Sequence, residues 1–151
     1  MIDNGGRLID SAIGAEPVRA SSSVIVTGSV FAPANGTMAR YRLQEWLAFI
    51  NTELHKTFAP MFDASSPDSV KAATVAKLAK RIDWVAQQLD TKPYTLGEQF
   101  SVSDAYLFTI LSWCRGAGID LNDWPVLAAF QKRVAARPAV REAMRVEGLI
   151  G

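Results

Sequence analysis

The chain has 151 residues, and its 16 Lys and Arg nearly balance its 15 Asp and Glu, so the formal net charge is +1. This balance gives no reason to expect a nucleic acid or an anionic membrane as partner. The single cysteine, Cys114, excludes an internal disulfide framework and argues against a cysteine-based metal site. No apolar run approaches the length of a membrane span, and charged residues interrupt the N-terminus where a secretory signal would be apolar. We therefore expect a globular cytoplasmic protein without a metal.

The first 31 residues carry only a weak apolar pattern. Ser21, Ser22 and Ser23 are typical of a linker, and residues 24–27 suit a short strand that has no neighbour to pair with inside this chain. A turn-prone cluster at residues 34–37 then separates this region from strongly periodic sequence. We predict a flexible or weakly structured segment over 1–31 and a helical domain over 32–151.

A long first helix is predicted from Thr37 to Phe58. Tyr41, Ala48 and Phe49 widen its apolar surface, which indicates contact on two sides, with other helices or with a second subunit. Pro60 is expected to end the helix. The apolar stripe at three- and four-residue spacing consists of Leu43, Trp46, Leu47, Ile50, Leu54 and Phe58.

The second helix is predicted to follow Ser66 as N-cap, with Pro67 at the first helical position. Its apolar residues alternate at spacings of three and four, which favours close antiparallel packing against the first helix. The stripe consists of Val75, Leu78, Ile82, Val85 and Leu89.

The third helix begins with a capping box. With Ser101 as N-cap, Asp104 falls at the third helical position, where its carboxylate can reach back to the cap N–H and also meets the positive end of the helix dipole. The helix from Val102 onward is apolar almost all round, as expected of a buried central helix, and Gly116 with Gly118 is predicted to end it. Ser101 and Asp104 are thus interpreted as structural residues.

Two further helices complete the prediction. Pro125 opens a fourth helix with the stripe Leu127, Phe130 and Val134. Pro138 starts the last helix and Gly148 ends it. The fold class predicted from these elements is all-α, a helical bundle.

Three stretches resemble one known family. The capping box and central helix, residues 94–113, resemble the core of the C-terminal helical domain of the glutathione S-transferase family. Residues 40–50, followed by Glu-Leu-His-Lys at 53–56, resemble the first helix of that domain in the bacterial beta class. Residues 128–149 are similar to its closing segment. The resemblance runs from Ala32 to the end of the chain and implies the same helical bundle.

The resemblance also implies a second domain. Enzymes of this family place a thioredoxin-like domain first, and it carries the glutathione site and, in the beta class, a catalytic cysteine. Residues 1–31 are too short for such a domain, contain no cysteine, and offer only Pro17 as a cis-proline candidate. We therefore expect a C-terminal helical domain with no catalytic residue of its own.

His55 and Lys56 are the candidates for chemistry. The resemblance implies that both face the glutathione sulfur and the active-site cleft. A neutral imidazole can donate to or accept from a thiol, and a nearby positive charge lowers the pKa of a thiol by favouring the thiolate. The alternative is structural: His55 interacts with the dipole at a helix end, and Lys56 is a solvated charge.

Tyr106 and Trp113 lie seven residues apart on the central helix and therefore share a face. They are predicted either to line the electrophile site of the cleft or simply to belong to the core. Cys114 follows in the same apolar helix and is interpreted as a small buried hydrophobe, not a nucleophile.

Two positions depart from the beta-class pattern. Ala48 stands where that class often has an asparagine that holds glutathione across the dimer interface, and alanine has no donor. Ser112 stands where an arginine commonly precedes the tryptophan. Both changes weaken the expectation of cross-domain contacts to glutathione.

The function predicted from the resemblance is that of a helical domain in a glutathione-conjugating enzyme. It would form the electrophile-side wall and subunit contacts, with glutathione as co-substrate and a small electrophile as substrate, and would be inactive as an isolated chain. The alternatives are a non-catalytic binding or assembly module and a truncated gene product. Truncation predicts an exposed apolar surface and hence self-association or a homodimer.

Overall fold

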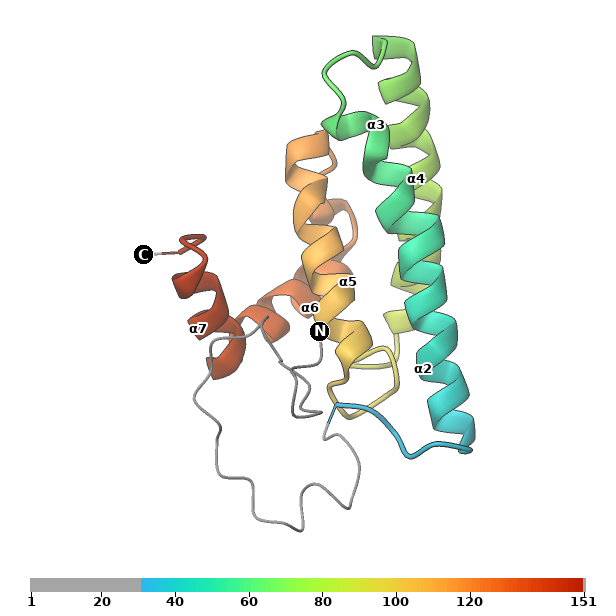
Figure 1. Cartoon of the computed structure of the whole chain (residues 1–151), viewed down its shortest axis with the longest axis vertical. Coiled ribbons are helices and arrows are strands. Elements are labelled where there is room, and N and C mark those ends of the chain that lie inside the picture. Colours follow the sequence, from blue (N-terminus) through green and yellow to red (C-terminus); the bar gives the residue numbers. More distant parts are fainter. Residues whose placement is uncertain (1–30, 151) are drawn as a thin grey trace, which may run out of the picture.

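The computed structural model describes residues 31–150, and these form helices joined by short loops (Figure 1). Within that range there is no β-strand, only an isolated bridge between Tyr94 and Gly97. The predicted all-α class is therefore confirmed. The flexible segment predicted for residues 1–31 and the short strand at 24–27 lie outside the described residues, except for Phe31.

The first helix, α2, spans Met38–Phe49 and begins where predicted. Thr37 is its N-cap, and the Thr37 hydroxyl accepts a hydrogen bond of 3.2 Å from the Arg40 N–H. Such a cap satisfies one of the N–H groups that the first turn leaves without a helical partner.

The helical path does not stop at Pro60. After α2 it continues as a π-helix, a 3₁₀ turn and the short helix α3, over Ile50–His55, Lys56–Phe58 and Ala59–Phe62. The prediction that Pro60 ends the helix was wrong. Pro60 stands in the first turn of α3, where no N–H is required of it, so the chain continues to Phe62.

The longest helix, α4, spans Asp68–Leu89 and runs antiparallel beside the first helical path (Figure 1). Its start lies one residue later than predicted: the Pro67 carbonyl accepts the first helical bonds, while the Ser66 hydroxyl donates to Asp63. The predicted stripe is confirmed, with Val75 partly buried and the others almost fully buried. The buried residues of α4 are Thr74, Leu78, Ile82, Val85 and Leu89.

The central helix, α5, spans Val102–Ser112 and continues as a 3₁₀ turn over Trp113–Ala117. Gly118 ends it in the left-handed conformation with φ 73°, which a residue without Cβ adopts at little cost. Its buried residues, Leu107, Ile110 and Leu111, belong to the same core cluster as residues of the first helical path, α4 and α6.

The capping box forms at the start of α5. The Ser101 N–H donates to Asp104 Oδ2 at 2.7 Å, and the Ser101 hydroxyl lies 2.7 Å from the same oxygen. Asp104 Oδ1 accepts a further 2.7 Å bond from the Thr95 N–H of the preceding loop. All three residues are buried, so the carboxylate holds both the helix start and the loop in place.

Two helices end the domain. Helix α6, Pro125–Ala135, packs on α5 and α4 through Leu127, Phe130 and Val134, as predicted. Helix α7, Pro138–Val146, contacts α6 and stands at the edge of the bundle (Figure 1). None of its residues is fully buried. Among residues 31–150, no helix has both the length and the apolar character needed to cross a membrane.

Candidate functional site

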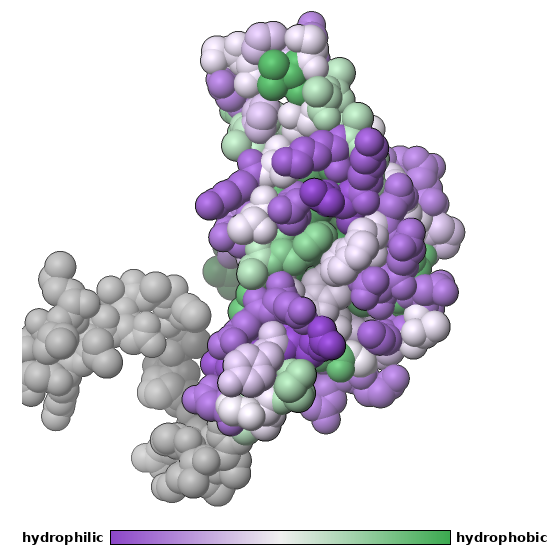
Figure 2. All heavy atoms as spheres, turned by 90° about the vertical axis from the view of Figure 1, so that its right-hand side faces the viewer, coloured by the Kyte–Doolittle hydropathy of each residue, from purple (hydrophilic) through white to green (hydrophobic). Residues whose placement is uncertain are grey.

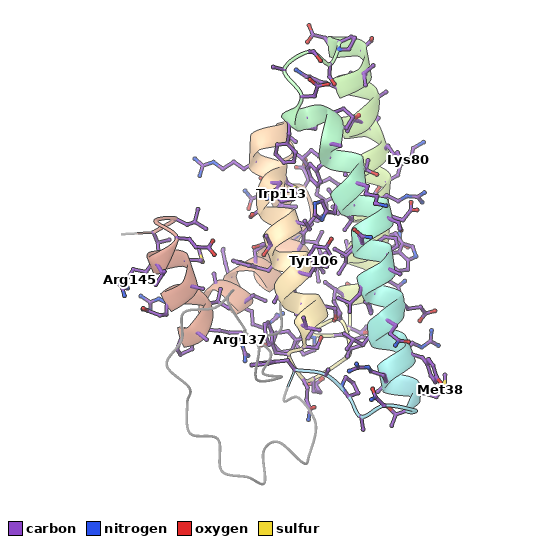
Figure 3. The ribbon with its side chains drawn as sticks, in the orientation of Figure 1. Met38, Lys80, Tyr106, Trp113, Arg137 and Arg145 are labelled. Carbon is purple, nitrogen blue, oxygen red and sulfur yellow. The ribbon has the colours of Figure 1, made fainter. Side chains whose placement is uncertain are left out.

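Three of the predicted site residues meet in space. Tyr106 lies on α5, and Trp113 begins the 3₁₀ turn that continues it (Figure 3). His55 lies at the end of the π-helix that packs against α5. The His55 Nδ1 is 2.6 Å from the Tyr106 hydroxyl, and the His55 ring meets the Trp113 ring edge-on with centroids 5.0 Å apart. The predicted shared face of Tyr106 and Trp113 is therefore the face that contacts His55.

Two phenylalanines extend this group. The Trp113 ring also makes edge contacts with Phe58 and Phe62, at centroid distances of 5.7 and 5.0 Å. Phe58 is buried, whereas Phe62 is 65% exposed. We call His55, Phe58, Phe62, Tyr106 and Trp113 the His55 cluster. It combines an apolar aromatic surface with one imidazole, a combination suited to a flat apolar ligand that carries one polar group.

An irregular backbone positions His55. The Lys56 N–H bonds to the carbonyl of Asn51, five residues back, and the Ala59 N–H bonds to Lys56, three residues back. A π-helical turn is wound more widely than an α-helical turn, and a 3₁₀ turn more tightly. Side chains between residues 50 and 58 therefore point in directions that differ from those of a regular α-helix. Leu54 and Phe58 are buried here, while His55 is exposed and contacts Tyr106 of α5.

The π-helix was not predicted from the sequence. Its residues have an ordinary helical pattern, and hydrogen bonds over five residues leave no signature in the spacing of apolar side chains. Pro60 was the one available signal, because proline lacks an N–H and crowds the carbonyl four residues earlier, here that of Lys56. That crowding is consistent with the 3₁₀ turn that precedes α3.

Tyr106 keeps its proton in this environment. Burial raises the pKa of the Tyr106 hydroxyl above its ordinary value, because the phenolate would lose hydration. The side chain is partly buried, and its ring stands edge-on to the His55 ring with centroids 5.8 Å apart. The hydroxyl is therefore a neutral hydrogen-bonding group, not a negative charge.

Lys56 is not part of the His55 cluster. Its side chain is exposed, and of the contacts found between residues 31 and 150 none joins it to Tyr106 or Trp113. The role that the resemblance gives to Lys56, facing the glutathione sulfur, therefore stays a prediction.

Cys114 lies in the core next to Trp113 in the chain. It is fully buried, and burial raises the pKa of its thiol to about 12. A thiol with such a pKa is not a nucleophile near neutral pH, because only the thiolate reacts. The described part of the chain also contains no group of three His, Cys, Asp or Glu side chains that could hold a metal ion.

A separate groove of about 610 Å³ lies between α2 and α4. Trp46 and Phe49 of α2 meet Trp84 of α4 there, with centroid distances of 5.5 and 4.3 Å to the Trp84 ring. Figure 2 shows this side of the molecule, where pale and green surface lies among purple hydrophilic residues. We call Trp46, Phe49 and Trp84 the aromatic groove. It is distinct from the His55 cluster, with which it shares no residue.

The fold agrees with a family match. Residues 49–138 match the family model "Glutathione S-transferase, C-terminal domain", which is more than half of the chain. The chain therefore belongs to the glutathione S-transferase family and contains its C-terminal helical domain. The resemblance drawn from the three sequence stretches is confirmed.

Individual relatives point the same way. The glutathione S-transferase GstA of Escherichia coli O157:H7 is 39% identical over 120 residues, which are 80% of this chain and 59% of that protein. A glutathione transferase from Methylococcus capsulatus has a TM-score of 0.79 at 46% identity, over 84% of this chain and 64% of that one. The beta-class enzyme of Sphingomonas chungbukensis has a TM-score of 0.76 at 39% identity, over 80% and 60%.

The present chain thus spans about three fifths of the length of these relatives. The matches to the Escherichia coli and Sphingomonas proteins cover most of the described residues and support the beta-class resemblance. The sequence identity of both matches, 39%, is well above the level at which a likeness supports only a shared fold.

Proposed function

We propose that this chain provides the helical side of a glutathione-conjugating site. In this proposal the His55 cluster is the wall on which an electrophilic substrate lies, and His55 stands next to the glutathione sulfur. The observation that carries the proposal is the 2.6 Å contact between His55 Nδ1 and the Tyr106 hydroxyl at the edge of an aromatic surface. It joins a polar group and an apolar surface, which conjugation of an apolar electrophile requires.

The chemistry assigns separate tasks to the two parts of the cluster. The glutathione thiolate attacks an electrophilic carbon, an S–C bond forms, and a leaving group departs with its electron pair or a polarised double bond takes up a proton. Trp113 and Phe62 bind the apolar body of the electrophile and exclude water. The His55 imidazole hydrogen-bonds the sulfur and so influences the pKa of the thiol.

The peptide part of glutathione needs further groups. The family resemblance assigns these to a thioredoxin-like domain, and Ala48 and Ser112 do not restore the contacts that asparagine and arginine make in the beta class. We therefore propose that the helical domain alone is inactive and that the thioredoxin-like domain completes the site. A reaction that needs the free thiol of glutathione suits a reducing cytoplasm.

Calorimetric titration with glutathione, together with a conjugation assay on an aromatic chloride activated by nitro groups, tests this proposal. Both are run on the chain alone and on a fusion that carries, before Phe31, a thioredoxin-like domain of the kind that the family resemblance implies. We expect turnover in the fusion only, and a loss of about 10- to 100-fold in kcat/KM on His55→Ala. Lys80→Ala, on α4, is the matched control and should retain the activity of the fusion.

Two results would contradict the proposal. The first is a fusion that binds glutathione and turns over equally well with His55→Ala or Trp113→Ala, because the wall would then lie elsewhere. The second is a fusion that folds and binds glutathione yet shows no turnover at all. That result would favour the alternative of a binding or assembly module without catalysis.

We further propose that two copies associate through the aromatic groove. Trp84 is 39% exposed there, and Tyr41 on α2 is 57% exposed, which is unusual for large aromatic side chains. A two-fold contact would bury this face on both copies. Light scattering on the purified chain should give the mass of a dimer, and Trp84→Glu should convert it to a monomer. A monomer at high concentration before any substitution would refute this part of the proposal.

A further inference from the structure

The contact between His55 and Tyr106 has a direction as well as a length. A neutral imidazole carries one N–H and one bare nitrogen, and the hydrogen bond made by one nitrogen decides which of the two is protonated. Here Nδ1 is engaged at 2.6 Å by a hydroxyl oxygen, a separation typical of a strong hydrogen bond. The question is which group donates.

Two arrangements satisfy the distance. In the first, the Tyr106 O–H donates to bare Nδ1, and the imidazole proton lies on Nε2. In the second, Nδ1–H donates to the phenol oxygen, and the phenol proton must find another acceptor. Among the hydrogen bonds of residues 31–150, the Tyr106 hydroxyl makes only the one to His55. In the first arrangement the phenol proton of Tyr106, a partly buried residue, has a partner within the protein. In the second it has none, so the first is favoured.

The second ring nitrogen is open to a ligand. His55 is exposed, and within the described part of the chain no hydrogen bond or ion pair involves its Nε2. Trp113 and Tyr106 both meet the His55 ring edge-on, at interplanar angles of 82° and 73°, which restricts rotation of the imidazole. The ring is thus held at Nδ1 and free at Nε2.

We propose that Tyr106 is a positioning residue that fixes neutral His55 in the tautomer with the proton on Nε2, so that the open nitrogen is a hydrogen-bond donor. This inference rests on the proposed function and deepens it. An N–H donor stabilises a thiolate or another anionic acceptor and cannot take a proton from a thiol. His55 then supports the thiolate of glutathione as a donor and does not act as its general base.

Nitrogen-detected NMR of the unmodified chain tests the tautomer directly. His55 is the only histidine of the chain, so the imidazole nitrogen signals need no assignment among residues. At a pH above the titration midpoint read from the same spectra, we expect a bare Nδ1 and a protonated Nε2. A protonated Nδ1 in the unmodified chain would overturn the proposal without any variant.

Tyr106→Phe tests whether the hydroxyl is the cause. Removing one hydrogen bond should shift the ratio of the two tautomers about 3- to 10-fold toward Nδ1–H. Tyr41→Phe makes the same chemical change at an exposed residue of α2 and should leave the ratio unchanged. Trp113→Phe alters the packing around His55 but keeps the hydroxyl, so it should also leave the ratio unchanged. An equal ratio in Tyr106→Phe and in the unmodified chain would refute the proposed role of Tyr106.

The same spectra separate this inference from the proposed function. The tautomer is read without any ligand, so it stands or fails independently of glutathione. Addition of glutathione to the fusion protein should then shift the Nε2 signal of His55. A protonated Nε2 that glutathione does not affect would leave the role of Tyr106 intact and contradict the proposed function.

Discussion

His55 and Tyr106 lie 51 positions apart in the sequence, yet the Nδ1 of one and the hydroxyl of the other are separated by 2.6 Å. The contact joins the π-helix to the central helix α5 at a partly exposed place. Among residues 31–150 it is the only side-chain hydrogen bond that His55 makes to another side chain, so its strength should be measurable in isolation.

A double-mutant cycle should detect this contact. With Tyr106→Phe and Ala at position 55, singly and together, we expect a coupling of about 0.5–1.5 kcal/mol in the free energy of unfolding. Chemical denaturation measured for the four proteins gives the value. Additive effects of the two substitutions would mean that the hydrogen bond contributes nothing to stability.

Asp104→Ala should be strongly destabilising. It removes the carboxylate that accepts from the N–H groups of Ser101 and Thr95, and both donors would remain buried. We expect a loss of about 3 kcal/mol in the free energy of unfolding. Asp68→Ala, at the exposed first position of α4, is the matched control and should cost only about 0.5 kcal/mol. Equal losses in the two variants would contradict the structural role assigned to Asp104.

Two neighbouring glycines should respond differently to alanine. Gly118 has φ 73°, whereas Gly116 does not have a positive φ, and a methyl group at either position would meet no heavy atom within 4 Å. Gly118→Ala should therefore cost about 1 kcal/mol through backbone strain alone. Gly116→Ala should be neutral or slightly stabilising, because it reduces the freedom of the unfolded chain. Thermal unfolding compares them, and the reverse order would show that φ is not the cause.

The stability of the domain should fall at alkaline pH because of Cys114. Burial raises the pKa of the thiol from 9.0 to about 12, so above pH 9 the unfolded chain loses a proton that the folded chain keeps. The contribution of the Cys114 thiol to the free energy of unfolding is therefore fully present below pH 9. Between pH 9 and 12 the free energy of unfolding decreases by about 1.4 kcal/mol for each pH unit. Urea unfolding of the chain and of Cys114→Ala, at pH 8, 9 and 10, measures the difference. Parallel pH profiles would refute the prediction.

Much of the fold was predictable because its determinants are local. The stripe of α4 and the capping residues Ser101 and Asp104 act within one or two helical turns, and the structure has them as expected. The predicted helix ends that were wrong are those at two prolines. Pro60 was predicted to end a helix and Pro67 to be the first residue of one. Proline lacks the N–H that donates a helical hydrogen bond, and the sequence does not show whether the proline stands in a first turn, where that donor is not required.

The candidate site was predictable only in part. Helical periodicity was enough to place Tyr106 and Trp113 on one face, since residues seven apart lie almost two turns apart. It was not enough to show that His55 contacts both of these side chains. Those contacts depend on how the π-helix Ile50–His55 packs against α5.

The amino-acid sequence by itself determined the helices, most of their ends, the buried stripes and the membership of the family, because these follow from periodicity, capping and local motifs. The tertiary structure alone decided that the His55 imidazole meets the Tyr106 hydroxyl, and that Trp46, Phe49 and Trp84 meet between α2 and α4. The physical reason is that a contact between distant residues depends on how whole helices pack. Small changes in backbone winding alter which side chains face each other.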